Sequence, residues 1–315
     1  GVHDLLVARA DIERRLLRTP SDPIQTFSDD PLRMLRGVRF AAELGFELER
    51  GLLPTMSKLA PRLGPPVVAV ERIREELIRI LVSPRPSSGI ELLWQGGLLE
   101  RIWPEVAAGR GVEQGGWHTH DVYGHTLLAV ERIEPELRLR LAALFHDVGK
   151  PRVAAPDGTF YGHAEVGAEI TEAALARLRF PNQINSEVSQ LVRLHMRPIA
   201  YSRQWSDGAV RRLARTAGEL LPALLALARA DTAASAYPRP EEMHDLEHRL
   251  EAVLAEQPSR LRIPINGQDI MRQRGLSPSP EVGRIKARLI DLVLEGELEP
   301  ERETLLAYLE QNPDL

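Results

Sequence analysis

The chain has 315 residues, of which 43% are hydrophobic and 27% charged, with a formal net charge of −5 at pH 7. This length suits two or three domains, and the ordinary composition excludes disordered, collagen-like and coiled-coil classes. The sequence predicts neither a membrane-spanning helix nor a signal peptide. Because it contains no cysteine, it excludes disulfides, thiolate nucleophiles and Cys-ligated zinc, and any metal must be held by His and carboxylates.

The first 90 residues are net positive, with 14 Lys/Arg against 12 Asp/Glu, whereas the remainder is acidic. Within them, Asp30-Pro31 predicts an N-cap followed by proline at the first helical position. Gly45 predicts where that helix ends. A second run of apolar residues at helical spacing predicts a helix over residues 70–82.

The Pro- and Ser-rich segment 83–89 interrupts the helical pattern and is a candidate domain linker. A short helix is expected over residues 89–103, and helical spacing returns from about 121 to 255, ending in a charged helix over 241–256. Two or three short helices follow in 265–315, and alternating strand patterns are absent. We therefore predict an all-α, elongated, multidomain protein. The expected domains are residues 1–88, 89–257 and 258–315.

Two candidate metal ligands, His146 and Asp147, stand together near the end of the apolar helix LAALFHDVGK. A buried imidazole and carboxylate are costly unless something pairs with them, and a divalent cation would do so. Each candidate alone could be an ordinary buried polar group, but together they favour a mixed N/O site for Mn, Fe, Ni, Co, Zn or Mg. The predicted ligands are His125, His146, Asp147 and Asp231, from three apolar helices.

The pattern H…HD…D, with FHDVGKP at its centre, resembles the HD phosphohydrolase superfamily. The resemblance implies that the four ligands bind a metal and that Lys150 contacts phosphate. It also implies that His163 and His195 bind a second metal, as in some members. His118 could line the same site, whereas Asp121 is expected to cap the helix that follows it.

The chemistry implied by this resemblance is hydrolysis of phosphoesters, with His146, Asp147 and Lys150 as the catalytic group. A metal held by imidazoles and carboxylates polarises a phosphoryl oxygen and lowers the pKa of a bound water towards ~7. Mg, Mn, Ni or Co would suit this chemistry. Phosphomonoesters and 2′,3′-cyclic phosphates at RNA ends are the expected substrates.

A second motif, DDPLRMLRGVRFAAELGF, places Arg33, Arg36 and Arg39 at three-residue intervals on one helix. The spacing fits either a nucleotide-facing surface or a solvated basic face. The segment resembles the neck of class II tRNA nucleotidyltransferases and bacterial poly(A) polymerases, in which an E-D-x-x-R run pairs with the incoming base. The resemblance implies that Asp30 and Arg33 select the nucleotide, beside Arg36, with Asp29 replacing the family's Glu.

Two further elements match the same family. Glu71, Arg72 and Glu76 match an E-R-x-x-x-E element, which implies an ion pair that orders the neck. Residues 262–310 resemble the tail with which these enzymes dock tRNA. Without the family match, Glu71, Arg72 and Glu76 could equally form an ordinary ion pair on the surface of one helix.

The resemblance implies a cytoplasmic enzyme that adds C, A or CCA to tRNA 3′ ends, with tRNA, CTP or ATP, and Mg²⁺ as partners and no membrane. The family's catalytic head carries an Asp-x-Asp pair, which this sequence lacks. We therefore expect the sequence to begin where that head ends, and not by itself to hold the two Mg²⁺ ions of nucleotidyl transfer. The alternatives are a stand-alone HD phosphohydrolase and a non-catalytic RNA-binding fragment. No oligomeric state is predicted.

Overall fold

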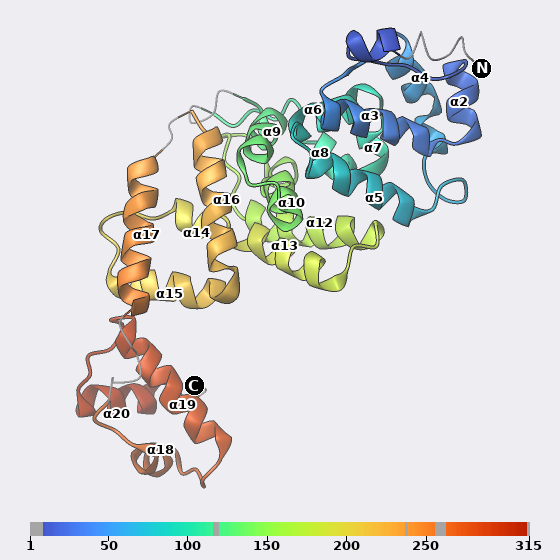
Figure 1. The fold of residues 1–315 in the computed structure, drawn as a ribbon. Coiled ribbons are helices and arrows are strands. Elements are labelled where there is room, and N and C mark those ends of the chain that lie inside the picture. The colour runs from blue at the N-terminus through green and yellow to red at the C-terminus, as the bar shows by residue number, and fades with distance from the viewer. Residues whose placement is uncertain (1–8, 116–119, 237–238, 256–262, 314–315) are drawn as a thin grey trace. The chain divides into compact units, whose positions relative to one another are not determined.

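The computed structural model describes residues 9–115, 120–236, 239–255 and 263–313. Across these residues the fold is helical, apart from a short parallel pair of strands, β1 (Leu16–Leu17) and β2 (Glu47–Leu48) (Figure 1). The predicted all-α class is thereby confirmed. Within the described ranges, no helix has the length and apolar character needed to cross a membrane.

The chain packs into two compact units, of which the first comprises Gly1–Ile199 and Pro222–Pro240 as far as they are described. In it α3 packs along α5, and α12 packs along α13. Its helices are α2 (Pro23–Asp29), α3 (Leu32–Leu44), α4 (Leu52–Leu59), α5 (Val70–Leu81), α6 (Pro86–Gln95), α7 (Leu99–Ile102), α8 (Pro104–Ala107), α9 (Val122–Arg132), α10 (Leu137–Phe145), α11 (Lys150–Val153), α12 (His163–Arg177), α13 (Asn182–Leu194), α14 (Met196–Ile199) and most of α16 (Leu221–Ala234).

The second unit comprises Ala200–Leu221 and Glu241–Leu315, again as far as they are described. Its helices are α15 (Asp207–Ala217), α17 (Pro240–Ala255), α18 (Gly267–Arg274), α19 (Pro280–Leu294) and α20 (Arg302–Gln311). An apolar core that includes Ile270, Leu289 and Leu305 joins α18, α19 and α20. The predicted boundaries after residues 88 and 257 concern functional domains, and they stay predictions.

Helix ends in the first unit follow local sequence signals. Asp30 accepts a hydrogen bond from the Leu32 amide through Oδ1 (3.1 Å), so that α3 begins at Leu32, one residue later than predicted. Gly45 ends α3 in the left-handed conformation, as predicted. The expectation of one helix over 89–103 was wrong, because Gly97 takes a φ of +65° and separates α6 from α7.

A buried ion pair joins α3 to α5. Arg39 Nε lies 2.7 Å from Glu76 Oε2, and Arg36 Nε donates to Glu76 Oε1 at 3.3 Å. Arg72 Nη2 lies 3.2 Å from Asp30 Oδ2. The ion pairs expected of Arg72 and Glu76 in the E-R-x-x-x-E element are therefore present, whereas Glu71 pairs with Arg179, which follows α12.

Arg39 does not share the exposed face of Arg33 and Arg36, contrary to the idea of a basic stripe of three residues. Arg33 and Arg36 are exposed, whereas Arg39 is buried. The reason is geometric: at about 100° per residue, each three-residue step falls about 60° short of a full turn. After two steps the side chain has reached the side of α3 that packs against α5.

Helix α10 places His146 and Asp147 in the interior of the first unit, because the C-terminal part of this helix is buried on every side. Residues 139–145 are all buried, which is typical of a helix that passes through a core. His146 and Asp147 follow directly after its last residue. Their backbone is therefore held inside the first unit, and both side chains are buried.

In the second unit, α18 begins with a capping box. Asn266 Oδ1 accepts from the amides of Gln268 (2.8 Å) and Asp269 (3.2 Å), and Asp269 Oδ2 accepts from the Asn266 amide (2.9 Å). Arg302 Nη1 also donates to Asp269 Oδ2 at 3.1 Å. These bonds to Arg302 and to the Asn266 amide lower the pKa of Asp269 to about 2.

We expect Asp269→Asn to lower the urea midpoint of unfolding at pH 7 and to lose this effect in acid. A carboxyl group whose pKa is lower in the folded chain stabilises it above the ordinary pKa, near 3.8, and ceases to do so as the pH falls through about 2. The difference in midpoint between wild type and variant should therefore shrink between pH 4 and pH 2. Glu310→Gln, at an exposed position on α20, is the control. An equal difference at pH 7 and pH 2 would contradict the assignment.

Candidate metal centre

The structure brings all six predicted metal ligands into one buried cluster in the first unit. Five separate segments supply them: α9, the end of α10, the start of α12, the end of α13, and α16. The clustered residues are His125, His146, Asp147, His163, His195 and Asp231, all buried. Since these residues span more than 100 positions of sequence, only the tertiary fold makes them neighbours.

Three of the histidines are oriented in the same way by the backbone. Nδ1 of His146 donates to Ala143 O (2.8 Å), and Nδ1 of His195 donates to Val192 O (2.6 Å). Nδ1 of His163 donates to the Phe160 carbonyl (2.8 Å). A carbonyl oxygen can only accept, so Nδ1 carries the hydrogen in each ring. In the neutral ring, Nε2 then has a free lone pair, which is the form that a metal binds.

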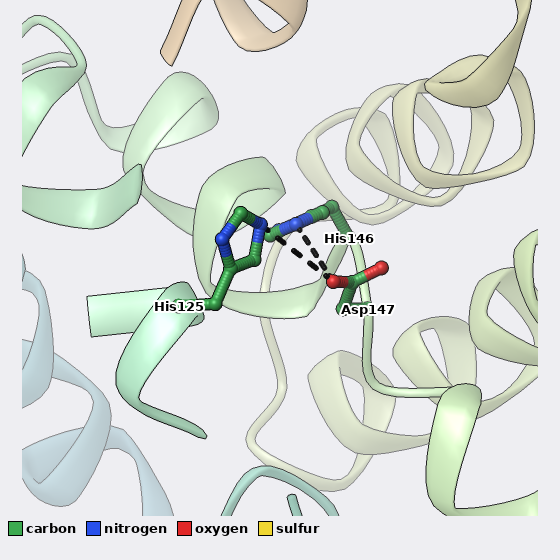
Figure 2. A group of neighbouring side chains, drawn as sticks. All are labelled: His125, His146 and Asp147. Atoms are coloured by element: carbon green, nitrogen blue, oxygen red, sulfur yellow. Dashed lines mark ion pairs between the residues drawn. The ribbon is translucent and has the colours of Figure 1, made fainter. Parts of the chain in front are cut away.

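The first group of ligands is His125, His146 and one oxygen of Asp147. His146 Nε2 lies 3.2 Å from Asp147 Oδ2, and His125 Nε2 lies 3.8 Å from the same oxygen. Figure 2 shows both rings turned toward this carboxylate. Asp231 completes the group, with Oδ1 2.9 Å from His125 Nε2 and 3.8 Å from His146 Nε2.

The second group is His163, His195 and the other oxygen of Asp147. Asp147 Oδ1 lies 3.6 Å from His163 Nε2 and 3.8 Å from His195 Nε2. The two ring nitrogens themselves are 3.2 Å apart. Asp147 is thus the one residue common to both groups, and it offers a different oxygen to each.

The charge states of these residues suit a cation. Burial lowers the pKa of His195 to about 4 and also lowers that of His163, so both rings are neutral near pH 7. With both Nδ1 atoms donating, two lone pairs face each other across 3.2 Å. They would repel unless a positive charge lay between them.

The first group also favours a bound cation, but for a different reason. Burial disfavours a charged His146, but the attraction of Asp147 and Asp231 outweighs it and raises the pKa of His146 to about 9. Burial also works against ionisation of Asp147, yet His146 and Lys150 hold the pKa of this carboxyl well below its usual range. His146 Nε2 is buried with no well-aligned hydrogen bond. Without a metal, His146 is therefore protonated near pH 7, and a divalent cation held by its Nε2 and the ionised carboxylates would replace that proton.

Lys150 holds Asp147 rather than extending freely toward a ligand. Its Nζ donates to Asp147 Oδ2 (2.7 Å) and to Gln114 Oε1 (2.6 Å). The expected phosphate contact of Lys150 stays a prediction. Gln114 was missed by the sequence reading, because an isolated glutamine in a Gly-rich loop carries no pattern that distinguishes it.

Asp121 caps α9, as predicted. Its Oδ1 accepts from the Gly124 amide (2.7 Å), and its Oδ2 accepts from the Gly111 amide (2.7 Å). These bonds fix the start of the helix that carries His125. His118, the other candidate in this segment, lies outside the described residues.

The cluster opens into a pocket of about 550 Å³ whose wall includes Asp147, Lys150, His163 and Asp231. This volume lies in the range that binds small organic ligands. A ligand in the pocket would therefore reach residues of both groups from one side.

Two of the four predicted nucleotide-binding residues line a pocket, and two do not. Arg33 and Arg36 line a second pocket of about 200 Å³, with Phe40. Asp29 and Asp30 are not on its wall, because Asp29 ends α2 as an exposed residue and Asp30 pairs with Arg72. Arg33 Nη1 also donates to the carbonyl of Thr26 in α2 (3.3 Å).

The fold and the cluster define a helical protein with a buried His/Asp cluster suited to a divalent metal, and comparison with known families agrees. Residues 118–236 match the HD domain, and residues 45–109 match the family described as "Probable RNA and SrmB- binding site of polymerase A". Over 96% of its length the chain is similar in fold to the CCA-adding enzyme of Bacillus stearothermophilus solved with CTP, covering 67% of it (TM-score 0.57, 22% identity).

Sequence comparison with curated relatives shows the family to which the chain belongs. The chain is 40% identical to the CC-adding tRNA nucleotidyltransferase of Thermus thermophilus, over 94% of the chain and 69% of that protein. It is 36% identical to the A-adding tRNA nucleotidyltransferase of Deinococcus radiodurans, over 94% of the chain and 71% of that protein. The chain belongs to the tRNA nucleotidyltransferase family, which confirms the resemblance drawn from the sequence.

Proposed function

We propose that this chain serves the maturation of tRNA 3′ ends, with tRNA, CTP and ATP as its partners. The two relatives support this function, since both are named for adding C or A to tRNA. A tRNA substrate would place the reaction in the cytoplasm. Arg33 and Arg36, at the second pocket with Phe40, are the proposed contacts for the nucleotide, together with Asp30 and Asp29.

We further propose that the HD centre is a metal-dependent phosphohydrolase acting on phosphomonoesters and 2′,3′-cyclic phosphates. The observation that carries this proposal is Asp147, whose two oxygens face two separate groups of histidines at the floor of an open pocket. When bound, Mg, Mn, Ni or Co would polarise a phosphoryl oxygen and acidify a water molecule. Hydrolysis of a cyclic phosphate adds one water across one P–O bond, which leaves a ribose hydroxyl and a phosphomonoester.

The residues of the centre have distinct tasks in this proposal. His125, His146 and Asp231 would hold one metal with Asp147, and the paired imidazoles of the second group would hold another. Lys150 keeps Asp147 ionised and oriented through its bond to Oδ2. The backbone carbonyls that accept from Nδ1 keep the imidazole Nε2 atoms directed into the cluster.

The test is hydrolysis of 2′,3′-cAMP by the purified full chain after treatment with EDTA and after addition of each metal. We expect activity only with a divalent metal, because a bound metal is needed to acidify the attacking water molecule. Metal-dependent hydrolysis without any binding of tRNA would favour a stand-alone phosphohydrolase. Salt-dependent tRNA binding without hydrolysis under any metal would favour an RNA-binding role, and would contradict the phosphohydrolase proposal.

A further inference from the structure

The pocket over the metal centre extends well beyond the ligands that form its floor. Its wall continues over Phe160 and Tyr161 on one side and over Arg193, Met196 and Arg197 on another. None of these residues belongs to the predicted metal ligands or to the motifs of the sequence. A single phosphate group would leave most of the 550 Å³ unfilled.

Two arginines, Arg193 and Arg197, line this wall, which also carries the carboxylate of Glu165. Arg193 and Arg197 are four residues apart, on either side of His195, whose φ of −55° and ψ of −34° keep the chain helical there. Like charges at this spacing repel each other. Both side chains are exposed, and neither makes an ion pair among the residues that the structure describes. Arg193 donates only to the neutral amide oxygen of Gln190 (3.3 Å).

The wall also carries an aromatic side chain that is not packed into the core. Tyr161 is 86% exposed, the most exposed of the large hydrophobic and aromatic residues of the described chain. It lies between Phe160, whose carbonyl orients His163, and Gly162, which takes a φ of +77°. A tyrosine held beside a pocket offers a flat face on which a nucleobase can stack.

We infer that Arg193, Arg197 and Tyr161 form a subsite for the nucleotide that precedes the reacting 3′-terminal one. The two guanidinium groups bind the phosphodiester that joins the two nucleotides, since guanidinium pairs with phosphate through two parallel hydrogen bonds. Tyr161 stacks against a base. The pocket thus selects the end of an RNA strand over a free mononucleotide. This inference rests on the proposed phosphohydrolase function of the same centre.

The first experiment compares two substrates of the full chain loaded with metal: 2′,3′-cAMP and the dinucleotide ApA with a 2′,3′-cyclic phosphate. We expect kcat/KM to be about tenfold higher for the dinucleotide, from one added stack and one added phosphate contact. Arg197→Ala and Tyr161→Ala should each lower this ratio by about fivefold. Arg197→Lys should retain part of it, because the charge stays but the paired hydrogen bonds do not.

The matched control is Arg152→Ala. Arg152 is an exposed arginine two residues after Lys150, and it is not part of the pocket wall. It should leave the substrate ratio unchanged. The subsite is overturned if the wild-type chain has nearly the same kcat/KM for the dinucleotide and for 2′,3′-cAMP. It is also overturned if neither Arg197→Ala nor Tyr161→Ala changes the ratio of these two values.

A second experiment measures binding without catalysis. In EDTA, calorimetric titration compares the 3′-phosphorylated dinucleotide ApAp with 3′-AMP. Tighter binding of ApAp that disappears in Tyr161→Ala supports the subsite, even if the chain hydrolyses neither substrate and the phosphohydrolase proposal fails. If the chain hydrolyses 2′,3′-cAMP as well as the cyclic dinucleotide and binds 3′-AMP as tightly as ApAp, the subsite is overturned. The phosphohydrolase proposal would still stand.

Discussion

Replacing Asp147 by alanine is expected to lower phosphohydrolase activity at least about a thousandfold, because metal-assisted hydrolysis depends on a completely formed ligand set. Asp147 is the residue that both groups of histidines share. Its loss removes a candidate ligand from each group and leaves the buried Lys150 ammonium with Gln114 as its remaining hydrogen-bond partner among the described residues. An unpaired buried charge is itself costly.

The measurements are the rate of 2′,3′-cAMP hydrolysis and the bound metal per chain, determined by elemental mass spectrometry. Circular dichroism separates loss of the site from loss of the fold. Asp147→Asn keeps the volume of the side chain but removes its charge, and it should also lose metal. Asp157→Ala is the control, since Asp157 is exposed and bonds only to Thr159 in its own loop. Wild-type activity in Asp147→Ala would falsify the proposed centre.

Gly149→Ala is expected to destabilise the chain by about 1–3 kcal/mol or more, as overpacking of a rigid contact does. A Cβ at Gly149 would collide with the carbonyl oxygen of His163 and lie 2.7 Å from the Gly167 amide nitrogen. Both are backbone atoms, so no side chain can turn aside to make room. Since φ of Gly149 is −77°, the requirement for glycine comes from close approach rather than from backbone conformation.

The same substitution should also reduce metal binding, because α12 carries His163 at its first residue and would have to move. Urea unfolding and metal content together measure the effect. Gly283→Ala is the matched control: a Cβ there meets no atom within 4 Å, and alanine near the start of α19 should stabilise the chain by up to about 0.5–1 kcal/mol. If Gly149→Ala keeps wild-type stability and metal content, the close approach of α11 and α12 does not hold the site together.

Sequence by itself determined the features that depend on neighbouring residues. Apolar spacing predicted the helices, because one helix face must be buried whatever it packs against. Asp121 and Gly45 were predictable as helix ends from their own side-chain chemistry. The candidate metal ligands were also accessible, since a buried His146 and Asp147 in an apolar helix are costly unless something pairs with them.

Only the tertiary structure decided which distant groups share an environment. It turned Arg39 inward to Glu76 and joined Lys150 to Gln114. It also gave each oxygen of Asp147 to a different group of histidines. Helical periodicity fixes the direction of a side chain relative to its own helix, but not the neighbour that the packed helices bring to it. The candidate metal ligands and their two groups could therefore be named from the sequence, whereas the sharing of Asp147 between the groups and the wall of the pocket above them depended on how the helices pack.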